Sequence, residues 1–304
     1  MEIKVFDELV ARVKNSNKKF RVAVANAGDA HTLEAVEIAC REGIISPVLV
    51  GDKAEILRLL GEMRLAVPEE DVIDIAGVPE AAAKAVELVR AGKADFLMKG
   101  KMDTGVLLKA VVNKETGLGM GKLMSIFLLA QIPNYHKLVA VVDGGMVMYP
   151  TLEQKKGIIE NTVEAMRDLG YDRPKVGVLA CIEKVNPKMP ETLEADALKK
   201  MNQAGEIENC IVEGPISYDC AMSGEISKMK GFESPCAGDC DILISPNIHA
   251  GNILTKALHI TGNAATAGFI VGAQCPIVMS SRGSEPEEKF MSIILAAAVV
   301  LGRG

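Results

Sequence analysis

Short apolar runs alternate with segments of helical pattern along most of this chain, and this alternation restricts the fold more than any other feature. Fully apolar strands that are separated by helices are typical of parallel sheets, because helices cover both faces of such sheets. The sequence therefore predicts an α/β protein with mostly parallel sheets. The predicted strands are Phe20–Ala25, Ser46–Val50, Val72–Ile75, Ala94–Met98, Leu138–Val142, Lys175–Cys181, Cys210–Glu213, Ile242–Ile244, Gly268–Gly272 and Pro276–Met279.

The length of the chain allows two such units. With 304 residues, two domains can each bury a core of their own. A long helical pattern that begins just after Tyr149 marks the expected boundary. The last strand and helix, residues 276–301, are too few to form a domain alone, so we expect them to complete the first one. The predicted domains are residues 1–148 plus 269–304, a discontinuous α/β domain, and residues 149–268, a second α/β domain.

Charge and composition argue against several classes of protein. A net charge of −6 disfavours a surface that binds nucleic acid or an anionic membrane. The N-terminus lacks the pattern of a signal peptide, and no charge-free apolar run reaches about 18 residues, so we expect no membrane span. The seven cysteines are scattered, and the pair Cys236 and Cys240 has no second ligand pair nearby. We therefore expect reduced thiols, no metal site and a cytoplasmic location.

The glycine-rich turn Thr116–Lys122 is similar to a nucleotide-binding loop but lacks its defining residues. A P-loop needs Gly at the position of Thr116 and Ser or Thr at the position of Leu123. The turn does not complete the dinucleotide motif GxGxxG either, because Lys122 occupies the position of the last glycine. We interpret this segment as a surface loop.

The stretch Asp241–Phe290 holds the clearest candidate for an anion site. One strand in it stops at Ser245 and leads through a turn of small residues into a helix; a later strand runs into Ser281, Arg282 and Gly283. Anionic ligands bind where strand ends face helix starts, because free backbone N–H groups and the helix dipole converge there. Ser281 adds a hydroxyl group, and Arg282 adds a bidentate fork for an anion.

Seven short segments follow one another along the chain: MKGKMDT (98–104), GKLMS (121–125), Asp143 with Tyr149-Pro150, KMNQAG (200–205), GPISYD (214–219), PNIHAGN (246–252) and Ser281-Arg282. Together they resemble the phosphate acetyl/butyryltransferase family, and look most like its phosphate butyryltransferase branch. The resemblance implies a fold like that of isocitrate dehydrogenase, with two α/β domains, a cleft between them, and a homodimer or higher homo-oligomer. It also implies the reaction acyl-CoA + phosphate ⇌ acyl phosphate + CoA, without metal or bound cofactor, since coenzyme A is a substrate.

The resemblance also implies roles for individual residues. Arg282 would clamp the phosphoryl group, and Ser281 would hydrogen-bond the sulfur or the carbonyl oxygen of the thioester. Glu288 falls where phosphotransacetylases place an acid, with Glu287 adjacent, and one of them would act as base for the CoA thiol. Because thiolate is a tolerable leaving group, phosphate could attack directly in a ternary complex. The expected substrate- and CoA-binding residues are Lys99, Asp103, Thr104, Ser125, Asp219, Asn247, Gly251, Asn252 and Lys256, with amides at the start of the helix near Asn252 as further donors.

Structural roles for several of these residues stay open. Acidic residues in a first helical turn are favoured by the helix dipole alone, and Asp103 with Thr104 would suit a helix N-cap. The chain also departs from the butyryl branch, which tends to carry Asn at the position of Val147 and Asp at that of Ser284. We expect a short, butyryl-like acyl chain, with an acetyl-preferring phosphotransacetylase as the alternative.

Two other functions are weighed against the transferase. One is a non-catalytic regulatory module that binds CoA or acyl phosphate; the retained pair Ser281 and Arg282 argues against it. The other is a nicotinamide-dependent dehydrogenase of related fold, which is disfavoured because no predicted strand is followed by a complete glycine fingerprint.

Overall fold

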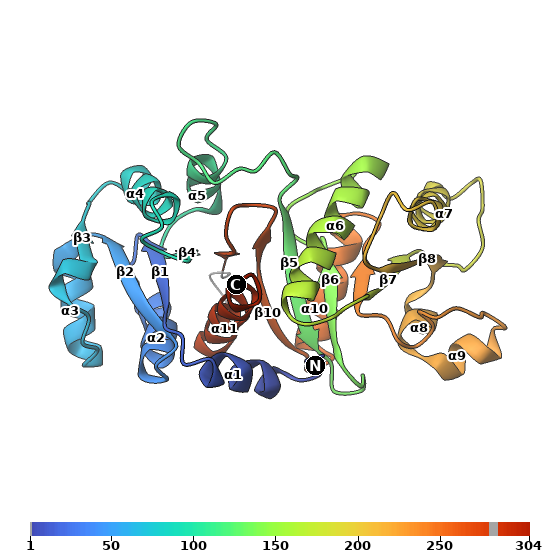
Figure 1. Cartoon of the computed structure of the whole chain (residues 1–304), viewed down its shortest axis with the longest axis horizontal. Coiled ribbons are helices and arrows are strands. Elements are labelled where there is room, and N and C mark those ends of the chain that lie inside the picture. Colours follow the sequence, from blue (N-terminus) through green and yellow to red (C-terminus); the bar gives the residue numbers. More distant parts are fainter. Residues whose placement is uncertain (1, 280–284) are drawn as a thin grey trace. The chain divides into compact units, whose positions relative to one another are not determined.

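The structure, a computed structural model, describes residues 2–279 and 285–304, and the chain divides into two compact units (Figure 1). The flanking unit consists of residues 7–122 and 267–304, and the inserted unit consists of residues 1–6 and 123–266. The chain therefore enters the inserted unit after residue 122, whereas the sequence pattern predicted a boundary near residue 148.

Strand pairing explains why the first boundary lies earlier than expected. Strands β5 (Ser125–Gln131) and β6 (Leu138–Val142) pair with each other in antiparallel orientation, and β6 pairs in parallel with β9 (Ile242–Ile244). Both β5 and β6 thus belong to the sheet of the inserted unit.

The strands of the flanking unit follow the order β3-β2-β1-β4-β11-β10. All neighbours in this order are parallel except β11 and β10, which are antiparallel. From β1 the chain moves outward through β2 to β3 and then returns to the other side of β1 with β4. The strands are β1 (Phe20–Ala25), β2 (Ile45–Gly51), β3 (Val72–Asp74), β4 (Phe96–Lys99), β10 (Ala265–Val271) and β11 (Ile277–Val278).

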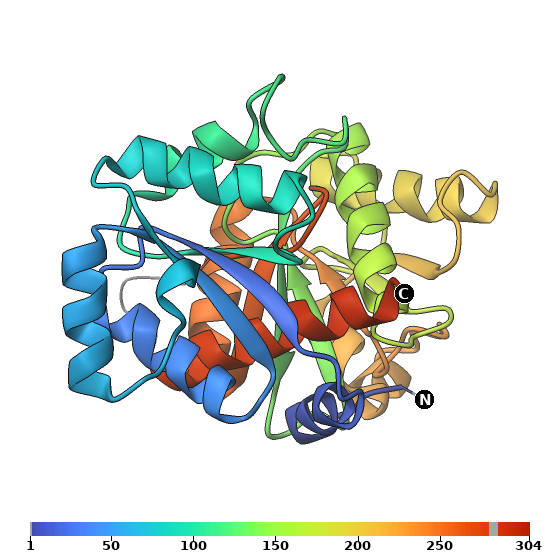
Figure 2. The ribbon, with the colours of Figure 1, turned by 60° about the vertical axis from the view of Figure 1, so that its left-hand side comes forward.

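Helices cover both faces of this part of the sheet. Helix α2 packs against α3 and α11, whereas α4 packs against α5 and against β1 and β2. Figure 2 shows α4 on one side of these two strands and α2 on the other. The helices are α1 (Phe6–Asn15), α2 (Ala30–Arg41), α3 (Lys53–Met63), α4 (Val78–Arg90), α5 (Thr104–Val111) and α11 (Pro286–Gly302), with a 3-10 turn at Glu69–Asp71.

The inserted unit has the strand order β5-β6-β9-β7-β8, in which β6, β9, β7 and β8 are mutually parallel. Its other elements are β7 (Lys175–Leu179), β8 (Ile211–Ile216), α6 (Leu152–Asp168), α7 (Pro190–Gln203), α8 (Tyr218–Met222), α9 (Gly224–Met229) and α10 (Ile248–Ile260). Helices α6 and α7 pack together, while α8 and α10 contribute side chains to a core cluster over β6, β7 and β9. The prediction of an α/β fold with mostly parallel sheets is confirmed.

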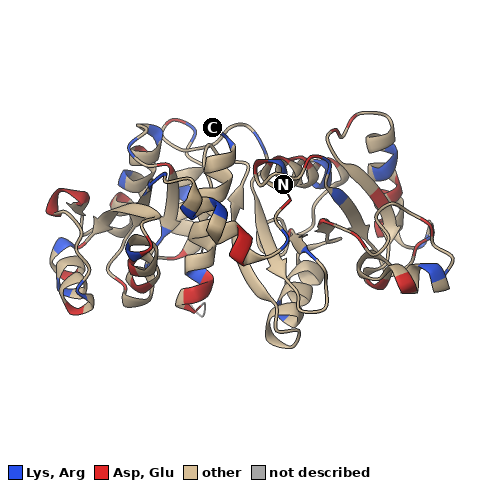
Figure 3. Cartoon of the chain, turned by 60° about the horizontal axis from the view of Figure 1, so that its bottom comes forward, with Lys and Arg blue, Asp and Glu red and all other residues tan. Residues whose placement is uncertain are grey.

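Aliphatic side chains make up most of the core, and the largest fully buried side chains are those of Tyr171, Phe20, Phe96, Phe127 and Phe269. Both β1 and β6 are buried along nearly their whole length, which explains why their sequences are continuous apolar runs. Figure 3 shows that charged residues lie mainly on helices and loops. Within the described ranges, no helix is both long and apolar enough to cross a membrane. The glycine-rich segment 116–122 is a largely exposed loop, which agrees with its prediction.

Candidate functional site

A pocket of about 660 Å³ opens in the flanking unit at the carboxyl ends of β1 and β4. The strand order reverses between these two strands, and α/β proteins commonly bind ligands outside the carboxyl ends of strands at such a point. Helices α2 and α5 also begin at this pocket, so the positive ends of their helix dipoles lie there. The charged and ionisable side chains on the pocket wall are those of Lys99, Lys101, Lys289, Asp29, Asp103 and His31.

The loops that follow β1 and β4 are locked together by backbone hydrogen bonds. The N–H of Gly100 donates to Ala25 O (2.8 Å), and the N–H of Lys101 donates to Asn26 O (2.9 Å). A Cβ atom on Gly100 would lie 2.3 Å from Asn26 O, so only glycine permits this approach. The amide of Asn26 donates in turn to Lys101 O. This arrangement fixes the backbone that carries Lys99 and Lys101.

Lys99 and Asp103, two of the predicted binding residues, both line this pocket. Lys99 is 6% exposed, and its ammonium group donates to Gly100 O (3.3 Å) and Met102 O (3.1 Å). Asp103 occupies the N-cap position of α5, yet its side chain makes no capping hydrogen bond there. Thr104 is the first helical residue and is exposed.

The acidic residues that were considered as bases lie in the first turn of α11. Glu287 is exposed, and Glu288 is half-buried. Ser281 and Arg282, the residues expected to bind the reacting groups, lie outside the described residues. Lys289, which was not among the residues predicted for the site, is 4% exposed and lines the pocket. The sequence gives no clear signal for this role, because Lys289 directly follows Glu287 and Glu288 in a charged first turn.

In the inserted unit, the loop after β6 is organised by Asp143. This side chain is 3% exposed, and its carboxylate accepts hydrogen bonds from the N–H groups of Gly145 (2.8 Å), Met146 (3.1 Å) and Val147 (3.0 Å). Burial raises the pKa of Asp143, and the three backbone donors oppose that shift. Val147, a departure from the butyryl branch, thus contributes its backbone to this loop.

Helix α10 is fastened to the same loop by the segment PNIHAGN. The side-chain amide of Asn252 donates to Gly144 O at 3.0 Å. A Cβ atom on Gly251 would lie 2.6 Å from Asp143 O, so the helix can approach the loop this closely only with glycine at that position. Asn247 caps the helix by accepting a hydrogen bond from the N–H of Ala250 (3.1 Å). Gly251, Asn252 and Asn247 therefore act on the backbone around Asp143.

The first backbone amides of α10 are already engaged, which differs from the expectation that they would be donors for phosphate. The N–H of Ile248 donates to Met148 O (2.9 Å), and the N–H of Gly251 donates to Asn247 O (3.1 Å). Together with the bond from Ala250 to the Asn247 side chain, these contacts use three donors of the first turn. That part of the prediction is wrong for these three amides. The N-cap residue Asn247 engages two of them locally, and only the bond from Ile248 to Met148 is a tertiary contact.

The remaining candidates of the inserted unit have different surroundings. Ser125 is fully buried at the start of β5, and among the described residues its hydroxyl oxygen has no hydrogen-bond partner. The hydroxyl oxygen of Ser245, at the end of β9, is in the same situation within the described part of the chain. Lys256 is exposed on α10.

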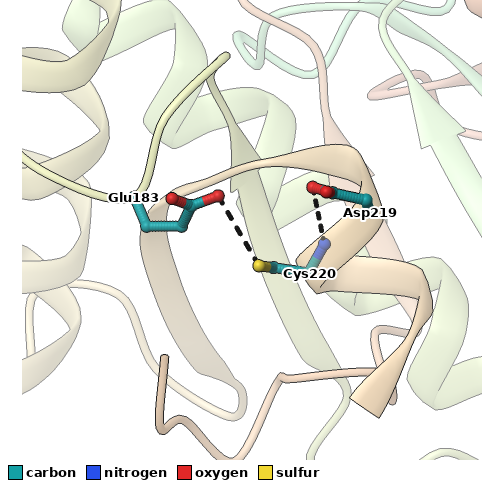
Figure 4. A group of neighbouring side chains, drawn as sticks. All are labelled: Glu183, Asp219 and Cys220. Atoms are coloured by element: carbon teal, nitrogen blue, oxygen red, sulfur yellow. Dashed lines mark hydrogen bonds between the residues drawn. The ribbon is translucent and has the colours of Figure 1, made fainter. Parts of the chain in front are cut away.

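Asp219 belongs to a cluster of ion pairs at the start of α8. The Lys230 ammonium group lies 2.8 Å from the Asp219 carboxylate and 2.9 Å from that of Glu183, and the single hydroxyl proton of Ser217 is within hydrogen-bond reach of either carboxylate. Lys230 and Ser217 lower the pKa of Asp219 to about 2. Figure 4 shows Glu183 and Asp219 on either side of Cys220, a grouping that could hold a metal ion. However, Lys230 already supplies a positive charge to both carboxylates.

A second pocket of the inserted unit, of about 430 Å³, lies at the carboxyl ends of β7 and β9. Its wall is largely apolar and includes Leu179, Met189, Tyr218, Pro246, Ala250 and Leu254. Ala250 and Leu254 are one helical turn apart, so they present one face of α10 to this pocket. The pocket therefore shares α10 with the residues that hold the loop around Asp143.

Comparisons with known proteins agree with the family resemblance. Residues 76–297 match the model of the phosphate acetyl/butaryl transferase family. The chain is 45% identical to a phosphate acetyltransferase of Thermotoga maritima, over 96% of this chain and 98% of the relative. It is 40% identical to a phosphate butyryltransferase of Clostridium acetobutylicum, over 98% of each chain.

A solved structure supports the same relationship. The crystal structure of a branched-chain phosphotransacylase from Enterococcus faecalis V583 is 31% identical in sequence and superposes with a TM-score of 0.83. The match covers 92% of this chain and 99% of the other. Sequence and structure thus agree over nearly the whole length, and this chain belongs to the phosphate acetyl/butaryl transferase family, a family of phosphate acyltransferases.

Proposed function

We propose that this protein catalyses acyl-CoA + phosphate ⇌ acyl phosphate + CoA, with a short, butyryl-like acyl chain. The observation that carries the proposal is similarity over nearly the full length to relatives named for acetyl and butyryl transfer, in a chain that retains Ser281-Arg282. A pocket with three lysines on a protein of net charge −6 supports it, because both substrates are anionic.

The proposed mechanism is direct attack in a ternary complex. A phosphate oxygen forms a bond to the thioester carbon, the C–S bond breaks, and the electron pair leaves with sulfur as thiolate. Arg282 holds the phosphoryl group, and Ser281 stabilises the negative charge that develops on the carbonyl oxygen or the sulfur. In the reverse direction, Glu288 or Glu287 removes the proton of the CoA thiol.

Several binding residues act through the backbone in this proposal. Asn247, Gly251 and Asn252 hold α10 against the loop around Asp143, so they position the loop. Lys99 and Asp103 lie on the wall of the flanking-unit pocket, where they suit the phosphate groups and polar parts of CoA.

The apolar pocket of the inserted unit suits the acyl chain. An acyl group is bonded directly to the carbon that phosphate attacks, so its pocket has to adjoin the residues that organise the site. Ala250 and Leu254 line the pocket from the same helix that holds the loop around Asp143. A largely apolar space of about 430 Å³ accommodates a chain longer than acetyl.

The test is phosphate-dependent release of free thiol from acetyl-, butyryl- and isobutyryl-CoA. We expect release by the wild type and a loss of at least about 100-fold in Arg282→Ala, as for removal of a charged group that contacts the transition state. Arg41→Ala is the matched control, because this exposed arginine pairs only on the helix surface with Glu37. Binding of CoA without release of thiol from any thioester would favour the regulatory module instead.

We also propose that the enzyme needs no metal or bound cofactor, acts as a homodimer or higher homo-oligomer, and is cytoplasmic. Activity that persists after dialysis against EDTA, with a solution mass of two or more chains, would support the first two statements.

A further inference from the structure

Lys289 is a buried cation on the wall of the flanking-unit pocket. The residue is 4% exposed and lies in the first turns of α11. In the part of the chain that the structure describes, neither a hydrogen bond nor an ion pair to its ammonium group is found, and this group is not among the fully buried polar atoms. The ammonium group therefore keeps some contact with water on the pocket side, although most of the residue is buried. A cation that has lost most of its water is stabilised by an acceptor that replaces it.

The other buried lysines all have such acceptors. Lys155 pairs with Glu194, and Lys137 lies 2.7 Å from both Asp239 and Asp241. Lys99 donates to two backbone carbonyl groups of its own loop. Lys289 therefore differs from the other lysines with the same degree of burial, including Lys99 on the wall of the same pocket.

The surroundings of Lys289 favour an anionic ligand. Lys99 and Lys101 line the same pocket, and the N-termini of α2 and α5 begin at its edge. Of the carboxylates on the wall, that of Asp29 is engaged in capping α2, where it accepts from the N–H of Thr32 at 3.0 Å. Asp103 is exposed. The volume of about 660 Å³ exceeds what a single phosphate ion needs and falls in the range of sites for larger ligands.

We propose that Lys289 binds a phosphoryl group of a substrate in this pocket, and this proposal rests on the proposed transferase function. A phosphoryl group supplies the acceptor that the ammonium group lacks in the described part of the chain, and the ion pair forms when substrate enters the pocket. Two substrates carry this chemistry. CoA brings phosphate groups on its nucleotide part, and inorganic phosphate is the second reactant.

The test compares Lys289→Met with Lys155→Met, which removes an equally buried lysine that has a protein partner. We measure KM for CoA in the direction from acyl phosphate, KM for phosphate in the direction from acyl-CoA, and the Tm of each variant. Lys289→Met is expected to raise one of the two KM values by about 10- to 100-fold, the loss typical of a hydrogen bond to a charged group. A rise for CoA assigns the nucleotide part as ligand, and a rise for phosphate assigns the second reactant.

The thermal stabilities of the two variants are expected to differ. Lys289→Met should leave Tm unchanged or raised, because an uncompensated buried charge is removed. Lys155→Met should lower Tm and leave both KM values unchanged, since Glu194 loses its partner. Only folded enzyme contributes to a measured KM. If both KM values of Lys289→Met equal those of the wild type, the proposal is therefore overturned, whatever the Tm of the variant.

A direct binding measurement tests the anion site at Lys289 independently of the transferase activity. If the wild type turns over no thioester, the proposed transferase activity is wrong, and the anion site is then tested with pyrophosphate as the probe. An increase in the Tm of the wild type with pyrophosphate that is absent in Lys289→Met supports the anion site on its own. The absence of that increase in the wild type overturns the site as well.

Discussion

The side-chain amide of Asn252 donates a hydrogen bond of 3.0 Å to the carbonyl oxygen of Gly144, and this bond joins α10 to the loop that follows β6. The same loop is held from within by three backbone N–H groups that donate to Asp143. Two strand ends of the inserted unit are thereby fixed to each other, since β6 and β9 are neighbours in its sheet.

Gly251→Ala should destabilise the protein because the added methyl group has no room. Its Cβ atom would meet the backbone at 2.6 Å from Asp143 O and 2.9 Å from Gly144 Cα. Neither contact is with a flexible side chain, so we expect a loss of about 1–3 kcal/mol in the free energy of unfolding. Urea unfolding measures this loss. Gly61→Ala in α3 is the control, because no atom lies within 4 Å of its added Cβ and helix propensity should raise stability by about 0.5–1 kcal/mol. Equal effects of the two substitutions would contradict the close approach of α10 to the loop.

Asp219→Asn should change how stability depends on pH. Lys230 and Ser217 lower the pKa of Asp219 from 3.8 to about 2 in the folded protein. The carboxylate therefore stabilises the fold above pH about 4, and this contribution is lost as the pH falls through about 2. Because the side chain is 42% exposed, solvent screening limits the contribution to less than about 1 kcal/mol. Thermal unfolding of wild type and variant between pH 2 and 7 should show a difference that shrinks toward pH 2 and in high salt. A difference that is constant over this range would count against the ion pair.

Ala250→Leu should shift selectivity toward the shorter acyl chain. Ala250 lines the apolar pocket, and the larger side chain takes up space that a butyryl chain would use. We expect kcat/KM for butyryl-CoA to fall at least about 10-fold relative to acetyl-CoA, as for other pockets that discriminate by methylene groups. Ala257→Leu makes the same change on an exposed position of α10 and should leave the ratio unaltered. Equal losses with both thioesters would place the acyl chain elsewhere.

The sequence predicted the fold class because its signal is local. Runs such as Phe20–Ala25 and Leu138–Val142 are buried on both faces, and continuous apolar residues are what such burial requires. The partners of a strand are not encoded in the same way. An apolar run has the same sequence pattern whichever sheet contains it. Residues 125–142 therefore do not indicate that β5 and β6 pair in antiparallel orientation, or that β6 pairs with β9.

In the candidate site, too, the residue types could be identified from the sequence, whereas their long-range contacts could not. Gly251 and Asn252 could be singled out from the sequence, but their contacts with Asp143 and Gly144 join residues more than one hundred positions apart. The engagement of the Ile248 amide, the first of α10, likewise depends on Met148, which lies far from the helix in sequence. Lys289 was missed because its burial depends on how α11 packs, and a lysine beside two glutamates reads as part of an exposed charged turn.

The order in which the two units are completed has a consequence for synthesis on the ribosome. Strand β11 lies between β4 and β10, although residues 277–278 follow the entire inserted unit in the chain. All strands of the inserted unit therefore emerge before the flanking unit can close, and one edge of β4 stays unpaired until β11 has been synthesised. Nascent chains that stall in this interval expose an apolar strand edge, so translation speed over the C-terminal segment should affect the yield of soluble protein.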